Sequence, residues 1–275
     1  MADSASKRAA VLGHPIAHSL SPVLHRAAYE ALGLNWTYER VDITGDNLAD
    51  FMAGLDETWA GLSLTMPLKR DVLALLDHAD PLVSATGAAN TVVLTNGRRY
   101  GFNTDVDGLV RALAEHSDSR PIHTAAVLGG GATARSAIAA LARGGVSSAT
   151  AYVRRPEAGE ELLLTAEALS FPLSIDLWTN AAGGLDADLV LSTTPVGASD
   201  PLAAWVPRTP GLLLDVVYDP WPTVLAAAWT GAGGRVASGL DLLLHQAVLQ
   251  VGLMTGFDAP LEIMRAALER AARSR

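Results

Sequence analysis

Short apolar runs alternate with stretches of helical periodicity along the chain, a pattern that favours α/β layers over a sandwich or a helix bundle. In the first half it predicts strands at 9–13, 36–41 and 62–66, and helices at 22–32, 47–55 and 71–76. Two more strands, 91–94 and 98–103, flank Asn96-Gly97, which is the strongest hairpin signal in the chain.

The second half follows a polar, turn-rich segment at 115–124, near which we expect a domain boundary. A strand at 125–128 then runs into three glycines and a helix, and further strands are predicted at 149–153, 189–192, 212–216 and 235–237. An amphipathic helix at 261–270 ends the pattern. The fold class that we expect is therefore α/β, with a second βα register after the glycines.

Composition narrows the class of protein. The chain has 275 residues, enough for one large domain or two ordinary ones, and with 49% apolar and 18% charged residues it is not disordered as a whole. The net charge of −9 argues against non-specific binding to nucleic acid or anionic membranes. The absence of cysteine excludes disulfides, thiolate catalysis and cysteine-based zinc sites, and no histidine set suggests another metal.

The pattern also bears on location and assembly. No apolar stretch of signal-peptide length follows the N-terminus, and polar residues interrupt the most apolar late segment, 240–257. We therefore expect a cytoplasmic protein. A homodimer stays open, because nothing in the sequence determines the oligomeric state.

The glycine turn is the first candidate site. Its residues, Gly129-Gly130-Gly131-Ala132-Thr133-Ala134, have the spacing G-x-G-x-x-A, a permitted form of the dinucleotide-binding fingerprint. Glycine lets the backbone approach a pyrophosphate, and the N-terminus of the following helix offers N–H groups to it. The alternative is a tight βα turn without a ligand.

Two arginines indicate which dinucleotide is bound. Arg154 and Arg155 end the next predicted strand, where an NAD site places an acidic residue and an NADP site an arginine. Guanidinium groups can bind a 2′-phosphate through charge-assisted hydrogen bonds. A solvated turn paired with Glu157 or Glu160 is the alternative, but NADP is favoured.

Hydroxyl groups precede the first helix. Ser21 is expected to be its N-cap, with Pro22 at the first helical position, whereas Ser19 has no such role. Two hydroxyls beside a helix N-terminus suit a carboxylate, because the helix dipole favours negative charge there.

Three further polar residues lie at strand ends in the first half. Lys69 follows a strand at the edge where open α/β sheets bind ligands, although a surface lysine is the commoner case. Asn90 precedes a strand, where it could close an Asx-turn, and Asp105 follows one, where it could cap a helix beginning near 106.

Taken together, six segments resemble the shikimate dehydrogenase family: 13–22, 63–69, 87–91, 103–105, 215–220 and 239–246. The resemblance extends from the first strand to the final helices. It implies NADP-linked reduction of 3-dehydroshikimate to shikimate in aromatic amino acid biosynthesis.

The resemblance also implies roles for single residues. Ser19 and Ser21 match the pair that holds the substrate carboxylate, Lys69 and Asp105 match the catalytic pair, and Thr65, Asn90, Gln246 and Tyr218 match further substrate contacts. The cofactor residues would be Gly129, Gly130, Gly131, Ala132, Thr133, Ala134, Arg154, Arg155, Thr194 and Gly239. For Thr194, a simple turn at a strand end is the alternative.

Three positions depart from the family pattern. Asparagine is frequent in the family where Ser63 and Arg26 stand, and a late tryptophan is replaced by Met254, for which we expect helix packing. Ser63 can still bond a hydroxyl group but reaches less far than asparagine.

The resulting hypothesis is a fold of two α/β domains with a cleft between them. Residues 1–108 and 239–275 would bind substrate, because Gln246 joins the substrate residues only if the chain returns, and residues 109–238 would form a Rossmann-like NADP domain. One alternative is a quinate dehydrogenase, with NAD or NADP. Another is a non-catalytic NADP sensor, against which the presence of both Lys69 and Asp105 argues.

Overall fold

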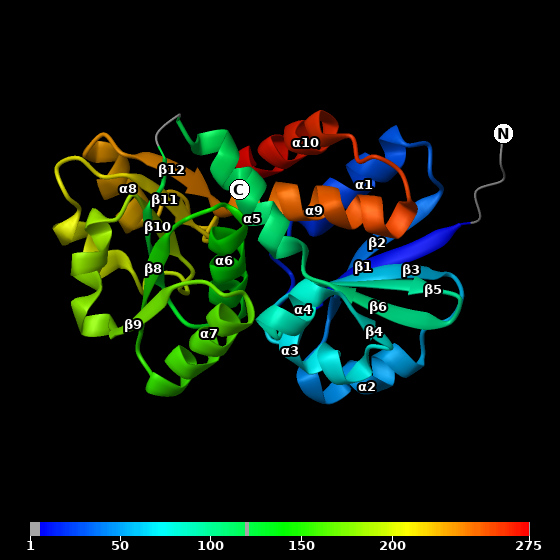
Figure 1. The fold of residues 1–275 in the computed structure, drawn as a ribbon. Coiled ribbons are helices and arrows are strands. Elements are labelled where there is room, and N and C mark those ends of the chain that lie inside the picture. Colours follow the sequence, from blue (N-terminus) through cyan, green and yellow to red (C-terminus); the bar gives the residue numbers. More distant parts are fainter. Residues whose placement is uncertain (1–5, 119–120, 275) are drawn as a thin grey trace. The chain divides into compact units, whose positions relative to one another are not determined.

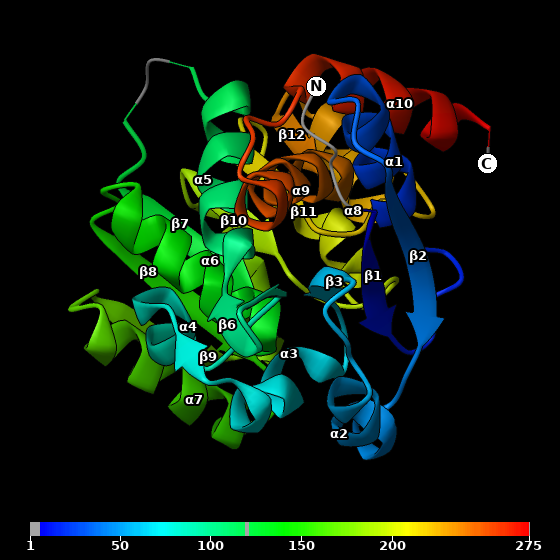
Figure 2. The same cartoon turned by 90° about the vertical axis from the view of Figure 1, so that its right-hand side faces the viewer.

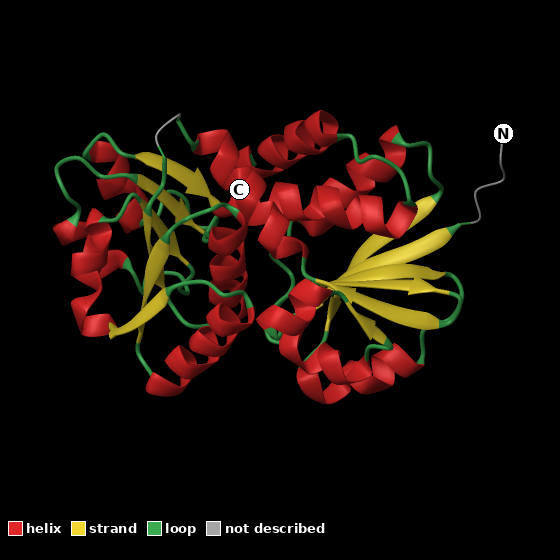
Figure 3. Ribbon diagram, viewed as in Figure 1, coloured by secondary structure: helices red, strands yellow, loops and turns green. Residues whose placement is uncertain are grey.

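Two six-stranded sheets, each with helices on both faces, organise the chain (Figures 1 and 3). The computed structural model describes residues 6–118 and 121–274. The chain leaves the first unit after Thr104 and returns to it at Leu243, so residues 105–242 form the second unit. The change of unit comes before the turn-rich segment at 115–124, of which Ser119 and Arg120 lie outside the described residues.

The first sheet has the order β2-β1-β3-β5-β6-β4 and is mixed, because β5 runs antiparallel to β3 and β6. Its unit contains β1 (Lys7–Gly13), α1 (Ser21–Ala31), β2 (Trp36–Asp42), α2 (Gly45–Ala53), β3 (Trp59–Leu64), α3 (Leu68–Asp71), η1 (Val72–Leu75), β4 (His78–Ala79), α4 (Pro81–Thr86), β5 (Thr91–Thr95), β6 (Arg98–Phe102), most of α9 (Gly239–Thr255) and α10 (Leu261–Arg273).

Alternate residues of β1 serve the two faces of this sheet, because side chains along a strand point to opposite sides. Leu12 packs in one core with Met52 of α2. Its neighbour Val11 packs in another with Tyr29 of α1 and Met254 of α9, which confirms the packing role expected for Met254. Figure 2 shows α10 lying alongside α1.

The predicted hairpin is confirmed. Asn96 and Gly97 join β5 to β6 with φ values of 51° and 71°. Two consecutive positive φ values are what a two-residue type I′ turn requires, and asparagine and glycine tolerate them best.

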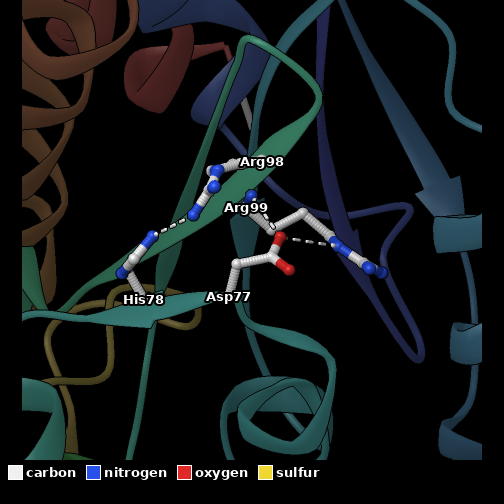
Figure 4. A network of polar contacts seen from close by, with 4 residues as sticks. All are labelled: Asp77, His78, Arg98 and Arg99. Carbon is white, nitrogen blue, oxygen red and sulfur yellow. Dashed lines mark hydrogen bonds and ion pairs between the residues drawn. The ribbon is translucent and has the colours of Figure 1, made fainter.

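Strand β4 was not predicted, because two exposed residues give no periodicity. Polar contacts hold it at the sheet edge (Figure 4). The Asp77 carboxylate accepts hydrogen bonds from the Arg99 backbone N–H at 2.8 Å and from Arg99 Nε at 3.4 Å. These bonds lower the pKa of Asp77, and Arg98 lies 3.1 Å from the His78 ring.

The second sheet is entirely parallel, with the order β12-β11-β10-β7-β8-β9. The first strand of this unit, β7, lies in the middle of the sheet, and the later strands are added first on one side and then on the other. This is the doubly wound arrangement of the Rossmann fold, as predicted. Its elements are α5 (Thr104–His116), β7 (Thr124–Leu128), α6 (Ala132–Arg143), β8 (Ser148–Val153), α7 (Pro156–Ala168), β9 (Leu173–Leu177), η2 (Trp178–Asp186), β10 (Leu189–Ser192), η3 (Asp200–Trp205), β11 (Leu212–Asp215), α8 (Val224–Gly231) and β12 (Arg235–Ser238).

The sequence pattern did not predict several elements of this unit, among them β9 and α8. Strand β9 lies at the sheet edge and alternates only weakly, and the short helix α8 is almost entirely apolar, with its Trp229 buried in the core. Across residues 6–118 and 121–274, no helix is both long and apolar enough to cross a membrane.

Candidate active site

The glycine turn lies where the strand order of the second sheet reverses. β7 ends at Leu128 beside β10, and α6 begins at Ala132. Parallel sheets bind nucleotides at this point, outside the carboxyl ends of the strands. The N-cap of α6 is Gly131, and no side chain caps the helix there, so the N–H groups of the first turn suit an anionic group.

Glycine occupies each of the three positions for a different physical reason. Gly129 adopts φ +113°, a conformation that side chains disfavour. A Cβ on Gly130 would lie 2.8 Å from Ala158 Cβ and 3.2 Å from Val153 Cγ1, so the turn packs closely on α7. A Cβ on Gly131 would meet nothing within 4 Å. Packing thus explains the second glycine, whereas the third keeps space open where a pyrophosphate would approach, and the turn fits a dinucleotide.

We expect Gly131→Ala to raise the KM for NADP about tenfold or more, because the methyl group would stand between the amides and the pyrophosphate. The melting temperature should stay within about 2 °C of wild type, since φ at this residue is −89° and the space is open. Gly130→Ala is the matched control, which should lower stability by about 1–3 kcal/mol through overpacking. An unchanged KM for NADP in Gly131→Ala would contradict a cofactor role for the turn.

Arg154 and Arg155 are exposed at the end of β8, where α7 begins. Among the described residues, neither guanidinium forms an ion pair with Glu157 or Glu160, the partners that a solvated turn would use. Both therefore stay candidates for binding a 2′-phosphate.

The structure corrects the prediction that Ser21 caps the first helix. Ser21 is the first residue of α1, its N-cap is Leu20, and no side chain caps the helix. Pro22 fits the second position because the N–H groups of the whole first turn have no partner in the helix. Ser19, for which no structural role was expected, accepts a hydrogen bond from Ser21 N–H at 3.3 Å.

The two hydroxyl groups nevertheless lie together. Ser19 Oγ and Ser21 Oγ are 3.3 Å apart, and both residues are buried. Arg40 of β2 donates from Nε to the Ser19 carbonyl at 2.8 Å, which holds the loop in place. Arg26, where the family often has asparagine, donates in the same way to the Tyr38 carbonyl at 2.8 Å and so ties α1 to β2.

Backbone hydrogen bonds bring Lys69 and Asn90 into one corner of the first unit. Lys69 is the second residue of α3, and its carbonyl accepts from Ala89 N–H at 2.8 Å. The Asn90 carbonyl accepts from Leu64 N–H at 2.7 Å, next to Thr65. Two separate sequence motifs, 63–69 and 87–91, therefore meet at the carboxyl end of β3.

The Asn90 side chain is buried and does not close an Asx-turn of its own segment. Its Oδ1 accepts from Thr104 N–H and from Thr91 Oγ1, each at 2.8 Å. Its Nδ2 donates to Gln246 Oε1 at 3.4 Å. The structure thus joins Asn90 to Gln246, which is 156 residues later in the chain.

Sequence reasoning missed Gln250. It lies one turn beyond Gln246 on α9, is 1% exposed, and contacts both Asn90 and Ser63. A second glutamine four residues after the first, in a helix otherwise apolar on that side, was the available signal.

His25 belongs to the same buried cluster. It stacks on Tyr38 with ring centroids 3.9 Å apart, and its Nε2 lies 3.2 Å from Gln250 Oε1. Burial lowers the pKa of His25 to about 3, so the imidazole is neutral near pH 7. The His25 ring therefore has a hydrogen-bonded packing role.

Asp105 belongs to the second unit, of which it is the first residue. It is buried as the second residue of α5, so it is not the N-cap that the alternative interpretation required. It directly follows Thr104, whose backbone N–H bonds to Asn90.

The loop that carries Tyr218 is shaped by Asp215, a fully buried carboxyl group that was not singled out from the sequence. It accepts hydrogen bonds from Thr223 Oγ1 at 2.8 Å and from Val217 N–H at 3.2 Å. Burial raises the pKa of Asp215. Tyr218 itself is half-buried in this loop.

Two further predicted cofactor residues have structural duties. Thr194 Oγ1 bonds to Ser199 Oγ at 3.4 Å, which is compatible with the turn alternative. A Cβ on Gly239 would collide with the backbone of Val216 and Val217, so close packing alone requires glycine there. Their cofactor roles stay predictions.

These features define a class. The second unit is a parallel sheet of Rossmann order with a glycine turn at its reversal, and the first unit carries a lysine, buried hydroxyls and buried amides. This is the organisation of a dinucleotide-dependent oxidoreductase. Residues 11–92 match the shikimate dehydrogenase substrate binding domain, and residues 239–269 match the shikimate 5′-dehydrogenase C-terminal domain. The chain belongs to the shikimate dehydrogenase family.

Similar proteins cover nearly the whole chain. A shikimate dehydrogenase (NADP(+)) of Desulforamulus reducens is 36% identical over 273 residues, 94% of each chain. The crystal structure of Mycobacterium tuberculosis shikimate dehydrogenase is 40% identical with a TM-score of 0.88, covering 96% of this chain and 99% of that one. A Thermus thermophilus shikimate 5-dehydrogenase in complex with NADP(H) and shikimate is 34% identical with a TM-score of 0.84, covering 96% and 99%.

The fold alone does not select the substrate. A quinate dehydrogenase of Corynebacterium glutamicum in complex with NAD is 25% identical with a TM-score of 0.86, and the match covers 96% of this chain and 99% of that one. Substrate and cofactor choice must therefore be argued from residues.

Proposed function

We propose that the protein catalyses the reversible, NADP-dependent reduction of 3-dehydroshikimate to shikimate, in the pathway of aromatic amino acid biosynthesis. Membership of the shikimate dehydrogenase family supports this reaction. The observation that favours NADP is the pair of exposed arginines at the end of β8, without an acidic residue at that strand end.

Lys69 is the proposed proton donor. NADPH supplies the hydride when it is bound, and reduction of a ketone builds negative charge on its oxygen. An ammonium group beside that oxygen stabilises the charge and delivers the proton; in the reverse direction the amine accepts it. The bond between Ala89 N–H and the Lys69 carbonyl fixes the backbone from which this side chain extends.

Asp105 is the proposed partner of Lys69, orienting the ammonium group and accepting a hydrogen bond from a ring hydroxyl. Thr65, Asn90 and Gln246 would bind ring hydroxyls, with Tyr218 beside the ring. The carboxylate would lie on Ser19 and Ser21, where hydroxyl donors and a helix N-terminus favour negative charge.

The cofactor assignment follows the second sheet. The residues from Gly129 to Ala134 would receive the pyrophosphate, and Arg154 with Arg155 the 2′-phosphate. Residues 109–238 are accordingly proposed as the NADP domain, and residues 1–108 with 239–275 as the substrate domain. A cytoplasmic location and a homodimer stay predictions of the same kind.

A four-way spectrophotometric assay tests the proposed reaction. Purified protein is given shikimate or quinate, each with NADP or NAD, and the absorbance of the reduced nicotinamide is followed. We expect the highest kcat/KM with shikimate and NADP. Turnover only with quinate and NAD would establish the alternative that the Corynebacterium glutamicum structure suggests. Absence of turnover in all four mixtures would favour a non-catalytic sensor.

A further inference from the structure

The Gln250 side chain uses its full hydrogen-bonding capacity inside the first unit. Its Nε2 donates to the Asn90 carbonyl at 3.2 Å and to Thr91 Oγ1 at 2.9 Å. Its Oε1 accepts from Ser63 Oγ at 2.7 Å and lies 3.2 Å from His25 Nε2. A primary amide offers two donors and two acceptor positions, so all four are paired.

These contacts allow only one orientation of the amide. The Asn90 backbone carbonyl is an acceptor only, so the side of Gln250 that faces it must be the NH2 group. Oε1 then faces Ser63 and His25, and the neutral imidazole donates from Nε2. Turning the amide over would set two oxygens against each other in a buried place.

The orientation passes through Thr91 to Asn90. Thr91 Oγ1 accepts from Gln250 at 2.9 Å and donates its own hydrogen to Asn90 Oδ1 at 2.8 Å, which is a shorter contact than the 3.3 Å to Thr104 Oγ1. This bond, with the one from Thr104 N–H, assigns Oδ1 to the inner side of the Asn90 amide. Nδ2 then lies on the side of Thr104 Oγ1 and Gln246 Oε1, to which it donates at 2.9 Å and 3.4 Å, and the long bond to Gln246 is the one that a substrate hydroxyl would replace.

We infer that Gln250 is a positioning residue for substrate binding: it holds the backbone and side chain of Asn90 so that the amide presents a donor to a substrate hydroxyl. Asn90 is therefore held by two glutamines of one helix, since Gln246 contacts its Nδ2 and Gln250 its carbonyl. Residues four apart in a helix share a face, so Gln246 and Gln250 both reach the start of β5, where Asn90 lies.

Ser63 does not belong to the path of hydrogen bonds that leads from Gln250 through Thr91 to Asn90. It accepts from Tyr38 at 2.6 Å, donates to Gln250 Oε1, and is buried. Its hydroxyl is thus already used in the place where the family often has asparagine.

The inference rests on the proposed function, and a double-mutant cycle on the KM for shikimate tests it. KM does not depend on the fraction of active protein, so partial misfolding does not imitate the result. We expect Gln250→Leu to raise this KM about five- to tenfold, the loss of one well-aligned hydrogen bond, with the KM for NADP within about twofold of wild type. In an Asn90→Ala background the same substitution should change KM by less than about twofold.

Ser63→Ala is the matched control, because it removes a bond from the same glutamine on the side away from Asn90. We expect a lower melting temperature and an unchanged KM for shikimate. If Gln250→Leu does not fold, as judged by circular dichroism, Gln250→Glu takes its place in the cycle. It has the same size and sets an oxygen against the Asn90 carbonyl, so the same rise in KM is expected.

Two results would overturn the inference. Additive effects of the Asn90 and Gln250 substitutions would mean that Gln250 does not act through Asn90, and an equal rise of KM in Ser63→Ala would mean general loosening of the core. Either result leaves the proposed reaction standing if wild-type protein oxidises shikimate. Wild-type protein without this activity would instead refute the reaction, and the inference with it.

Discussion

Lys69→Ala should lower kcat about 10²- to 10⁴-fold, while the KM for shikimate changes by a factor of about three or less. The ammonium group is needed when charge develops on the oxygen, so its loss affects the transition state more than the bound substrate. Initial rates over a range of shikimate concentrations, at saturating NADP, separate the two constants.

Arg70→Ala is the control for this prediction. Arg70 is the next residue of the short helix α3 and is exposed, whereas Lys69 is half-buried. We expect the Arg70 variant to retain kcat within about twofold of wild type. Near-normal turnover in Lys69→Ala would remove Lys69 from the mechanism.

The double substitution Arg154→Ser/Arg155→Ser should raise the KM for NADP about 100-fold and leave that for NAD within about twofold. Each charge-assisted bond to a phosphate contributes about tenfold at an exposed site, and NAD lacks the 2′-phosphate. The wild-type KM for NADP should also rise with ionic strength, more steeply than that of the variant, because salt screens exposed charges.

Single substitutions show which arginine carries the effect, since both side chains are exposed at the strand end. Arg208→Ser is the control: this exposed arginine precedes β11 and so belongs to the opposite end of the parallel strands. An equal loss with NAD and NADP in the double variant would show that the arginines do not read the 2′-phosphate.

The pattern of the sequence predicted much of the local structure. Alternating and periodic apolar residues located β1, β2 and β7, and Asn96-Gly97 located the hairpin, because these signals depend on neighbours within a few residues. Strand β4 and helix α8 were missed, since a two-residue strand has no period and a helix made almost entirely of apolar residues has no polar face.

At the candidate site, the sequence identified residue types but misjudged some duties. Ser21 was expected to cap α1, yet it is the Ser19 hydroxyl that accepts a cap-like bond, from the Ser21 backbone N–H. A shift of the helix start by one residue reverses such an assignment, and helix starts are the least certain part of any pattern.

The linear pattern of residues revealed which chemical groups are present: a glycine turn after a strand, two arginines at the next strand end, and a lysine, amides and hydroxyls at other strand ends. The tertiary structure alone decided which of these groups hold one another. Asn90, Ser63 and Gln250 are far apart in the chain, and each has several donors or acceptors that many partners could satisfy. Only the return of α9 to the first sheet buries them together, and burial is what forces each polar atom to find partners within the protein.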